Sequence, residues 1–257
     1  MSDTMPALFI GHGSPFNLFQ ENPFTNSLRA LGSTLSEPRA IVVVSAHWVT
    51  QGTKLTLDDN PRMIYDYHGF PLYFYEYIYP AKGSKQISEE IIDFLPKIIK
   101  SSSKWGIDHA ATIVLEKLFP KANIPVIELS LDYGKSPEFH YELGKKLKHL
   151  RENGIMFIGS GNLIHTFREV DWENQYGIPV SWAEELDSIH KQAIFTSDFD
   201  GLIHYERWPL STRGFQTNEH YLPMLYILGM KDTKDSLKFV YEGFQHGTVS
   251  HRSFMYH

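Results

Sequence analysis

The chain of 257 residues contains no cysteine. This absence excludes a disulfide framework, a thiolate metal site and a cysteine nucleophile. If the protein binds a transition metal, the ligands must therefore come from histidine, aspartate and glutamate side chains.

Excess basic charge and long apolar runs are also absent. The 24 Lys and Arg residues face 30 Asp and Glu residues, and no cluster of five or more basic residues occurs. Nucleic acid is therefore not expected as a partner. No run is long enough to span a membrane, and residues 1–6 lack the basic and apolar regions of a signal peptide. We expect a cytoplasmic protein without membrane contact, working as a monomer or a small homo-oligomer.

Several catalytic motifs are missing as well. The sequence has no His-Glu-x-x-His motif and no Gly-x-Ser-x-Gly motif, and residues 11–16 lack the last glycine of a dinucleotide-binding fingerprint. Ser160 stands between two glycines and formally permits a serine nucleophile. We expect it instead to serve as a helix cap or turn residue.

The remaining composition is that of an ordinary globular protein. Hydrophobic residues make up 42% of the chain and charged residues 21%, which excludes a mainly disordered or fibrous protein. This length suffices for one large core. We read residues 1–257 as a single catalytic domain.

Apolar runs of strand length recur along the chain and end near histidines. Residues 7–11 precede His12, residues 40–46 precede His47, and residues 155–161 precede His165. Further strand-like runs occupy residues 54–57 and 124–130, with helical patterns between the strands. This alternation predicts an α/β fold, a mostly parallel central sheet flanked by helices. Such sheets carry their chemistry at the carboxyl ends of the strands, where we expect a metal site.

The expected helices differ in how clearly their ends are marked. Pro96 interrupts the amphipathic stripe at residues 84–103, whereas Ser136 and Pro137 mark a clear helix start. The segments expected to be helical are residues 27–35, 84–103, 113–119, 136–152, 182–197 and 224–230. Residues 237–244 and 247–256 predict a final hairpin.

Residues 64–80 are dense in tyrosine and phenylalanine, with Gly69 and Pro71 near the middle. A long connection of this kind is typical of a functional flap over a site. The alternative is a tyrosine-rich surface loop that makes a dimer contact.

Four of the 13 histidines are placed to meet at one rim, namely His12, His47, His165 and His220. Neutral imidazole suits iron, zinc, copper and nickel, and a site with three protein ligands leaves positions open for catalysis. Five other histidines lie in polar or helical surroundings and are expected to have no part in the site: His149, His190, His204, His246 and His257.

Six segments together resemble the class III extradiol ring-cleavage dioxygenases, and within them the DOPA-dioxygenase-like branch. They appear in that branch's order and span most of the chain. The segments are residues 11–15, 45–48, 65–71, 106–110, 159–165 and 218–223. The resemblance implies a mononuclear Fe(II) site, and some members of the branch carry Zn(II) instead.

The resemblance also implies roles for individual residues. His12, His47 and His220 match metal ligands, and relatives outside the branch use a glutamate at the third position, which leaves Glu219 as an alternative or additional donor. His165 matches an acid/base residue or a fourth ligand.

Further matches concern the substrate. His109 matches a histidine near the substrate, which we expect to have a catalytic role. Ser14, Tyr65 and His68 match positions expected to bind the substrate, and His68 stands where an aromatic residue is usual.

The implied reaction inserts O2 into a catechol-type, DOPA-like ring and gives a muconic semialdehyde. Histidine has the pKa that a base for a catechol hydroxyl needs. Two other readings stay open from the sequence alone. One is a zinc hydrolase, in which the same histidines activate a water molecule. The other is a metal-binding protein without catalysis on the same fold.

Overall fold

The structure is a computed structural model that describes residues 4–173, 175–176 and 178–257. Within these residues an eight-stranded sheet forms the centre of the molecule, in the strand order β4-β3-β5-β2-β6-β1-β10-β7. Its strands are β1 (Ala7–Gly11), β2 (Ala40–Thr50), β3 (Thr53–Thr56), β4 (Ile99–Ser102), β5 (Val126–Asp132), β6 (Ile155–Gly161), β7 (Leu237–Tyr241) and β10 (Ser253–Tyr256). A separate short hairpin pairs β8 (Phe244–Gln245) with β9 (Val249–Ser250).

The four central strands, β5, β2, β6 and β1, run parallel to one another. Towards one edge, β10 pairs antiparallel with both β1 and β7. Towards the other edge, β3 pairs antiparallel with β5 and parallel with β4. The predicted α/β class with a mostly parallel sheet is confirmed, and the expected final hairpin is present as the β7–β10 pair.

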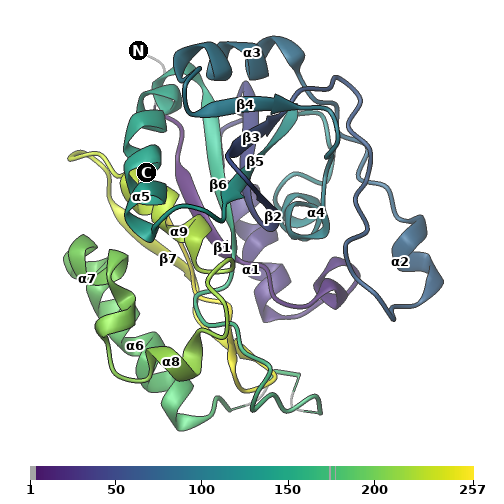
Figure 1. Cartoon of the computed structure of the whole chain (residues 1–257). Coiled ribbons are helices and arrows are strands. Elements are labelled where there is room, and N and C mark those ends of the chain that lie inside the picture. Colours follow the sequence, from purple (N-terminus) through teal and green to yellow (C-terminus); the bar gives the residue numbers. More distant parts are fainter. Residues whose placement is uncertain (1–3, 174, 177) are drawn as a thin grey trace.

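Helices cover both faces of this sheet, and short 3-10 segments join several of them (Figure 1). The helices are α1 (Pro23–Gly32), α2 (Leu72–Glu76), α3 (Lys85–Phe94), α4 (His109–Leu118), α5 (Pro137–Leu147), α6 (Ser181–Thr196), α7 (Phe199–Ile203), α8 (Ser211–Gly214) and α9 (Leu222–Gly229). The 3-10 segments are η1 (Pro15–Leu18), η2 (Lys148–Asn153) and η3 (Tyr205–Arg207).

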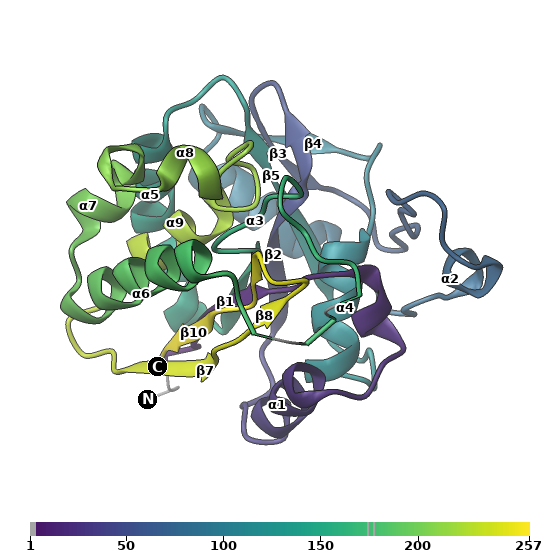
Figure 2. The same cartoon turned by 90° about the horizontal axis from the view of Figure 1, so that it is seen from below.

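The sheet separates two hydrophobic cores because successive side chains of a strand point to opposite faces. In β1, Phe9 joins a core with α5 and α9, whereas Leu8 and Ile10 join a core with α1 and α4. Figures 1 and 2 show these two helix pairs on opposite sides of the strands, with α6, α7 and α8 beyond α9. Burial on both faces explains why the central strands are almost continuously apolar.

Several of the expected helices have different limits in the structure; α4, for example, begins at His109 and not at Ile113. The stripe at residues 84–103 ends as helix α3 at Phe94, and Ile99 begins strand β4, so the prediction of one helix was wrong there. Pro96 supplies the physical reason, because proline removes a backbone donor and ends a helix. Helix α1 begins earlier than predicted, since Asn22 caps it in a capping box and Pro23 is its first residue.

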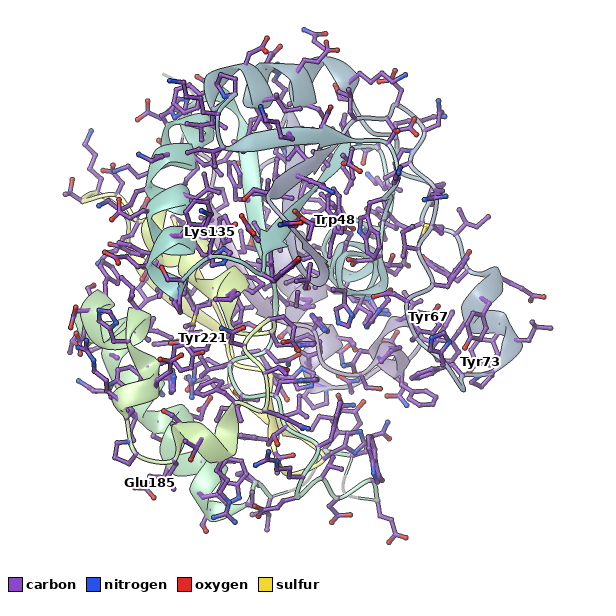
Figure 3. The ribbon with its side chains drawn as sticks, in the orientation of Figure 1. Trp48, Tyr67, Tyr73, Lys135, Glu185 and Tyr221 are labelled. Atoms are coloured by element: carbon purple, nitrogen blue, oxygen red, sulfur yellow. The ribbon has the colours of Figure 1, made fainter. Side chains whose placement is uncertain are left out.

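The tyrosine-rich segment stands away from the body, carrying the short helix α2 at its tip (Figures 1 and 2). Figure 3 shows Tyr67 where the segment meets the body and Tyr73 farther out. Tyr67 is buried, and its hydroxyl donates to the carbonyl of Phe74, 2.7 Å away. Tyr73 is exposed. Only the inner part of the segment is therefore placed to face a site.

None of the helices in the part of the chain described here has the length and apolar character needed to cross a bilayer.

Candidate active site

Five histidines gather at the carboxyl end of the central strands: the four that the strand pattern placed at one rim, and His109. His12 follows β1, His47 lies in β2, and His109 is the first residue of α4. His165 follows β6, and His220 lies just before α9. The ring centroids of His12 lie 5.3 Å from His47 and 5.4 Å from His220.

The backbone at the strand ends brings these rings together. The pairing of β2 with β5 shifts register between Val44 and Val49, and this irregularity directs His47 into the group. The amide of His12 donates to the carbonyl of Gly161, 2.9 Å away. A Cβ on Gly161 would lie 2.1 Å from the carbonyl oxygen of His220, so glycine allows β6 to approach that histidine.

The hydrogen bonds of His12 determine which ring nitrogen carries the proton. Its Nδ1 lies 3.1 Å from the hydroxyl oxygen of Ser160, which itself donates to the carbonyl of Ala110 at 2.7 Å. Since the serine proton is used there, Nδ1 of His12 donates and Nε2 keeps its lone pair. The same contacts occupy the buried hydroxyl of Ser160, which is not arranged as a nucleophile.

Asp66 joins two of the rings. Its Oδ2 lies 2.9 Å from Nδ1 of His47, and its Oδ1 lies 2.8 Å from Nδ1 of His109. A carboxylate only accepts, so both rings present Nε2 as a lone-pair donor. Nε2 of His47 is buried and has no hydrogen-bond partner within the described residues. An unpaired buried nitrogen of this kind is a natural metal ligand.

On the opposite side, Glu219 and His220 are neighbours in sequence and in space. Nδ1 of His220 lies 3.3 Å from Oε1 of Glu219. The ring of His165 stacks on that of His220, with centroids 3.7 Å apart and planes 8° apart. On this side the ring of His165 is held by stacking on His220 and not by a carboxylate that the two rings share.

Burial keeps most of these imidazoles neutral. Desolvation, followed by the charges of the neighbouring rings, lowers the pKa of His12 well below its ordinary value, and that of His165 likewise. Burial also lowers the pKa of His220 to about 4, although Glu219 opposes the shift. For His47 burial lowers the pKa, but the hydrogen bond and charge of Asp66 outweigh it and raise the pKa overall.

A cavity of about 490 Å³ opens beside these rings. Its walls are His12, Gly13, Ser14, Pro15, His47, Asp66, Tyr67, His68, Phe70, His109, His165, Phe167, Trp172, His220, Gln245, His246 and Val249. Ser14 and His68, predicted to bind substrate, belong to this lining. Tyr65 does not; its hydroxyl donates instead to the carbonyl of Tyr77, 2.8 Å away.

Sequence reasoning missed several residues of this cavity. Asp66 lies within residues 65–71, and a carboxylate between two tyrosines is a usable sequence signal for it. His246, expected to have no part in the site, lines the cavity. Phe167, Trp172 and Gln245 come from the loop after β6 and from β8, and no local pattern marks them.

The donor set fits a divalent transition metal. Nitrogen atoms of His12, His47 and His220 lie within 4.8 Å of one another. In each ring Nδ1 is engaged by a partner, which orients Nε2 and fixes its tautomer. Further groups that meet the same distance test are His165 with Glu219 and His220, and Asp66 with His47 and His109.

Comparison with known proteins identifies the family of the chain. The LigB family, the catalytic LigB subunit of aromatic ring-opening dioxygenase, matches residues 7–255. The 4,5-DOPA dioxygenase extradiol of Escherichia coli (strain K12) is 41% identical over 256 residues, which cover 97% of this chain and 94% of that protein. The 4,5-DOPA dioxygenase extradiol of Beta vulgaris is 29% identical over 259 residues, covering 96% and 95%.

A solved structure shares the fold. The crystal structure of an uncharacterized protein from Escherichia coli K12 superimposes with a TM-score of 0.85 at 38% sequence identity, covering 98% of this chain and 99% of that one.

The chain belongs to the LigB family and is an extradiol ring-cleavage dioxygenase, an oxidoreductase of a metal-dependent class that acts on a small aromatic substrate and O2. Within that class it falls in the DOPA-dioxygenase-like branch, as the sequence motifs predicted.

Proposed function

We propose that residues 1–257 form one catalytic domain that cleaves a catechol-type, DOPA-like ring next to its two hydroxyls and releases a muconic semialdehyde. The observation that carries this proposal is the convergence of His12, His47 and His220, each with Nδ1 engaged and Nε2 available. Three ligands leave room for two catechol oxygens and O2, a count that suits ring cleavage.

His12, His47 and His220 would hold the metal, which we propose to be Fe(II), with Zn(II) able to occupy the same nitrogen ligands. When bound, the metal lowers the pKa of a catechol hydroxyl and activates O2 beside the ring. Glu219 orients His220 through Nδ1 in this assignment and is not itself a ligand.

His165 is the proposed acid and base. Its lowered pKa, caused first by burial, keeps the ring neutral and therefore able to accept the proton of the second catechol hydroxyl. The protonated ring would then be placed to return that proton to an oxygen of the product. Stacking on His220 keeps His165 beside the metal ligands without committing its nitrogens to a carboxylate.

His109 has the complementary role of a fixed hydrogen-bonding group. Asp66 accepts from its Nδ1 at 2.8 Å, which leaves the lone pair on Nε2, and this nitrogen would accept a hydrogen bond from the substrate. The inner part of the tyrosine-rich segment, including Tyr67 and Phe70, lines the cavity and would exclude water from the reacting ring.

The experiment is oxygen uptake by protein that is purified without oxygen and loaded with Fe(II). DOPA, dihydroxyphenylacetate, protocatechuate and catechol are offered in turn while a yellow semialdehyde is followed by absorbance. We expect uptake that requires both Fe(II) and a catechol. The Zn(II)-loaded protein is the control and should take up no oxygen. Iron-loaded protein that consumes none with any catechol would contradict the proposal.

A further inference from the structure

A small cavity lies behind His109, on the side of α4 that faces the tyrosine-rich segment. Its volume is about 10 Å³, which is room for about one molecule of the size of water. Figures 1 and 2 show α4 between the sheet and the segment that carries α2. Residues of η1, of α4 and of this segment line the small cavity, namely Leu18, Met63, Ile64, Tyr65, Tyr67, Phe74, Tyr77, His109 and Thr112.

The small cavity borders the larger one beside the histidines, which we call the histidine cavity. Among the described residues, the two linings have Tyr67 and His109 in common. The rings of these two residues meet edge to face, with centroids 5.3 Å apart and planes 82° apart. Tyr67 and His109 therefore form the partition between the small cavity and the candidate active site.

The polar side chains around the small cavity have their protons committed elsewhere. A buried water molecule needs two to four hydrogen-bond partners. The donors and their acceptors are Tyr65 to the carbonyl of Tyr77, Tyr67 to the carbonyl of Phe74, Tyr77 to the carboxylate of Glu116, Thr112 to the carbonyl of Asp108, and Nδ1 of His109 to Asp66. None of these side chains has a proton left for a water molecule, so the small cavity is a poor site for water.

The other lining side chains are apolar: Leu18, Met63, Ile64 and Phe74. Voids of even this size are few in a protein, because interiors are close-packed and the walls of a void lose dispersion contacts. A dry apolar cavity takes up a small apolar guest in preference to water. Of the two substrates of this class of enzyme, O2 is apolar and small, whereas a catechol carries two hydroxyls and is far larger than the cavity.

A separate place for O2 is useful because the organic substrate occupies the histidine cavity. In the proposed function a catechol lies at the histidines, and Tyr67 and Phe70 help to exclude water from it. O2 that arrives after the catechol then finds the histidine cavity filled. The small cavity offers it a place beside the reacting ring that does not compete with the catechol.

We propose that the small cavity holds O2 and delivers it to the active site between the rings of Tyr67 and His109. This inference rests on the proposed function, because it takes the catechol to be cleaved at the histidines. It adds a binding site for an apolar gas that is distinct from the site of the catechol.

The paramagnetism of O2 gives a test that needs neither turnover nor a variant. Zn(II)-loaded wild type with isotope-labelled methyl groups is studied by NMR under O2 and then under N2 at the same pressure. We expect O2 to raise the relaxation rates of the Leu18, Met63 and Ile64 methyls about threefold or more above that of Ile92. Ile92 is a half-buried isoleucine on α3, outside the cavity lining. Equal increases at Ile64 and Ile92 would overturn the inference.

Filling the small cavity should slow the use of O2 without affecting the catechol. Ile64 is half-buried, so Ile64→Phe can add volume at the cavity with little strain in the core. We expect kcat/KM for O2 to fall about threefold or more, and KM for the catechol to stay unchanged. Initial rates of oxygen uptake at varied O2 measure this, with the catechol that the wild type cleaves fastest.

Two further variants separate filling from disturbance. Ile64→Ala changes the same position without filling the cavity and should keep kcat/KM for O2 within about twofold of the wild type. Ile92→Phe makes the same increase in size at a matched half-buried position and should also leave it unchanged. A fall in both Ile64 variants, or in neither, would overturn the inference.

The two measurements also separate this inference from the proposed function. Ring cleavage by a wild type whose Ile64 and Ile92 methyls respond equally to O2 would overturn the inference and leave the proposed function intact. Iron-loaded protein that consumes no oxygen with any catechol, while the cavity methyls still respond to O2, would instead contradict the proposed function alone.

Discussion

The two sides of the histidine group are built differently. On one side Asp66 contacts both His47 and His109, at 2.9 and 2.8 Å, and its side chain is 16% exposed. On the other side Glu219 contacts only His220, at 3.3 Å, and its side chain is 30% exposed. Within the described residues His165 makes no hydrogen bond to a carboxylate, although Glu219 lies within 4.8 Å, and its ring stacks on His220.

The two sides therefore differ in how firmly they hold their histidine rings. The shared carboxylate fixes two rings in one tautomer, and it raises the pKa of His47 against the effect of burial. The stacked ring of His165 keeps a lowered pKa and no such partner. The side with Asp66 is therefore suited to holding groups in place, and the side with His165 to moving a proton.

The largest expected effect tests the fixed side. His47→Ala should abolish stoichiometric metal binding, because a site with three ligands loses one, a greater loss than the roughly 10–100-fold caused by removing an outer partner. Metal content after dialysis, measured by mass spectrometry, checks this. A variant that retains a full equivalent of metal would show that His47 is not a ligand.

The next effect tests the side with His165. His165→Ala should keep its metal and lose about 10²–10⁴-fold in kcat, the amount that an acid/base group contributes. Metal content and steady-state turnover are measured on the same preparation. If the metal is lost as well, His165 is a ligand and the contrast between the two sides fails.

A histidine outside the site shows what burial does without a carboxylate. His190 is fully buried, donates from Nδ1 to the carbonyl of Leu186, and has its pKa lowered to about 4, first by desolvation. Below about pH 6.5 the histidine binds a proton in the unfolded chain, whereas in the folded protein it stays neutral until the pH is much lower. Stability is therefore retained above that pH and lost progressively as the pH falls towards 4.

His190→Gln should reduce the loss of unfolding free energy at low pH by about 3 kcal/mol at most, since each unit of pKa shift is worth about 1.4 kcal/mol. Urea unfolding of the metal-free wild type and variant near pH 7.5 and pH 5 measures it. If wild type and variant lose the same free energy of unfolding between the two pH values, His190 has no such lowered pKa.

The smallest expected effect comes from replacing each of the two carboxylates, Asp66 and Glu219, in turn. Asp66→Asn offers one acceptor and one donor, so it cannot accept from both His47 and His109. Metal affinity should fall about 10–100-fold, and Glu219→Gln should cost less because it disturbs one longer contact. Competition with a chromophoric chelator measures both variants. Equal losses would remove the distinction between the two sides.

The sequence predicted the sheet and its histidines because those signals are local. An apolar run followed by Gly11 identifies His12, and a β-branched run that ends near His47 identifies that residue, without knowledge of their neighbours. The helix expected at residues 84–103 failed for a related reason, since the apolar spacing of Ile98 and Ile99 continues the helical pattern after Pro96 although the chain has turned into an edge strand.

Such local patterns could not predict the long-range contacts. Gln245 meets Ser14 only because β8 folds back over the loop after β1, a contact between residues 231 positions apart. Asp66 acquires its role by lying between a residue of β2 and the first residue of α4. The participation of His246 likewise depends on the turn between β8 and β9, not on its neighbours in sequence.

The position of β1 has a consequence for synthesis on the ribosome. Phe9 pairs with Gly159 on one side and with Phe254 on the other, so this strand gains its second neighbour only when the residues of β10 have been made. His12, directly after β1, must wait for the same event to be held firmly. We expect the histidine site to form fully only after β10 has paired with β1.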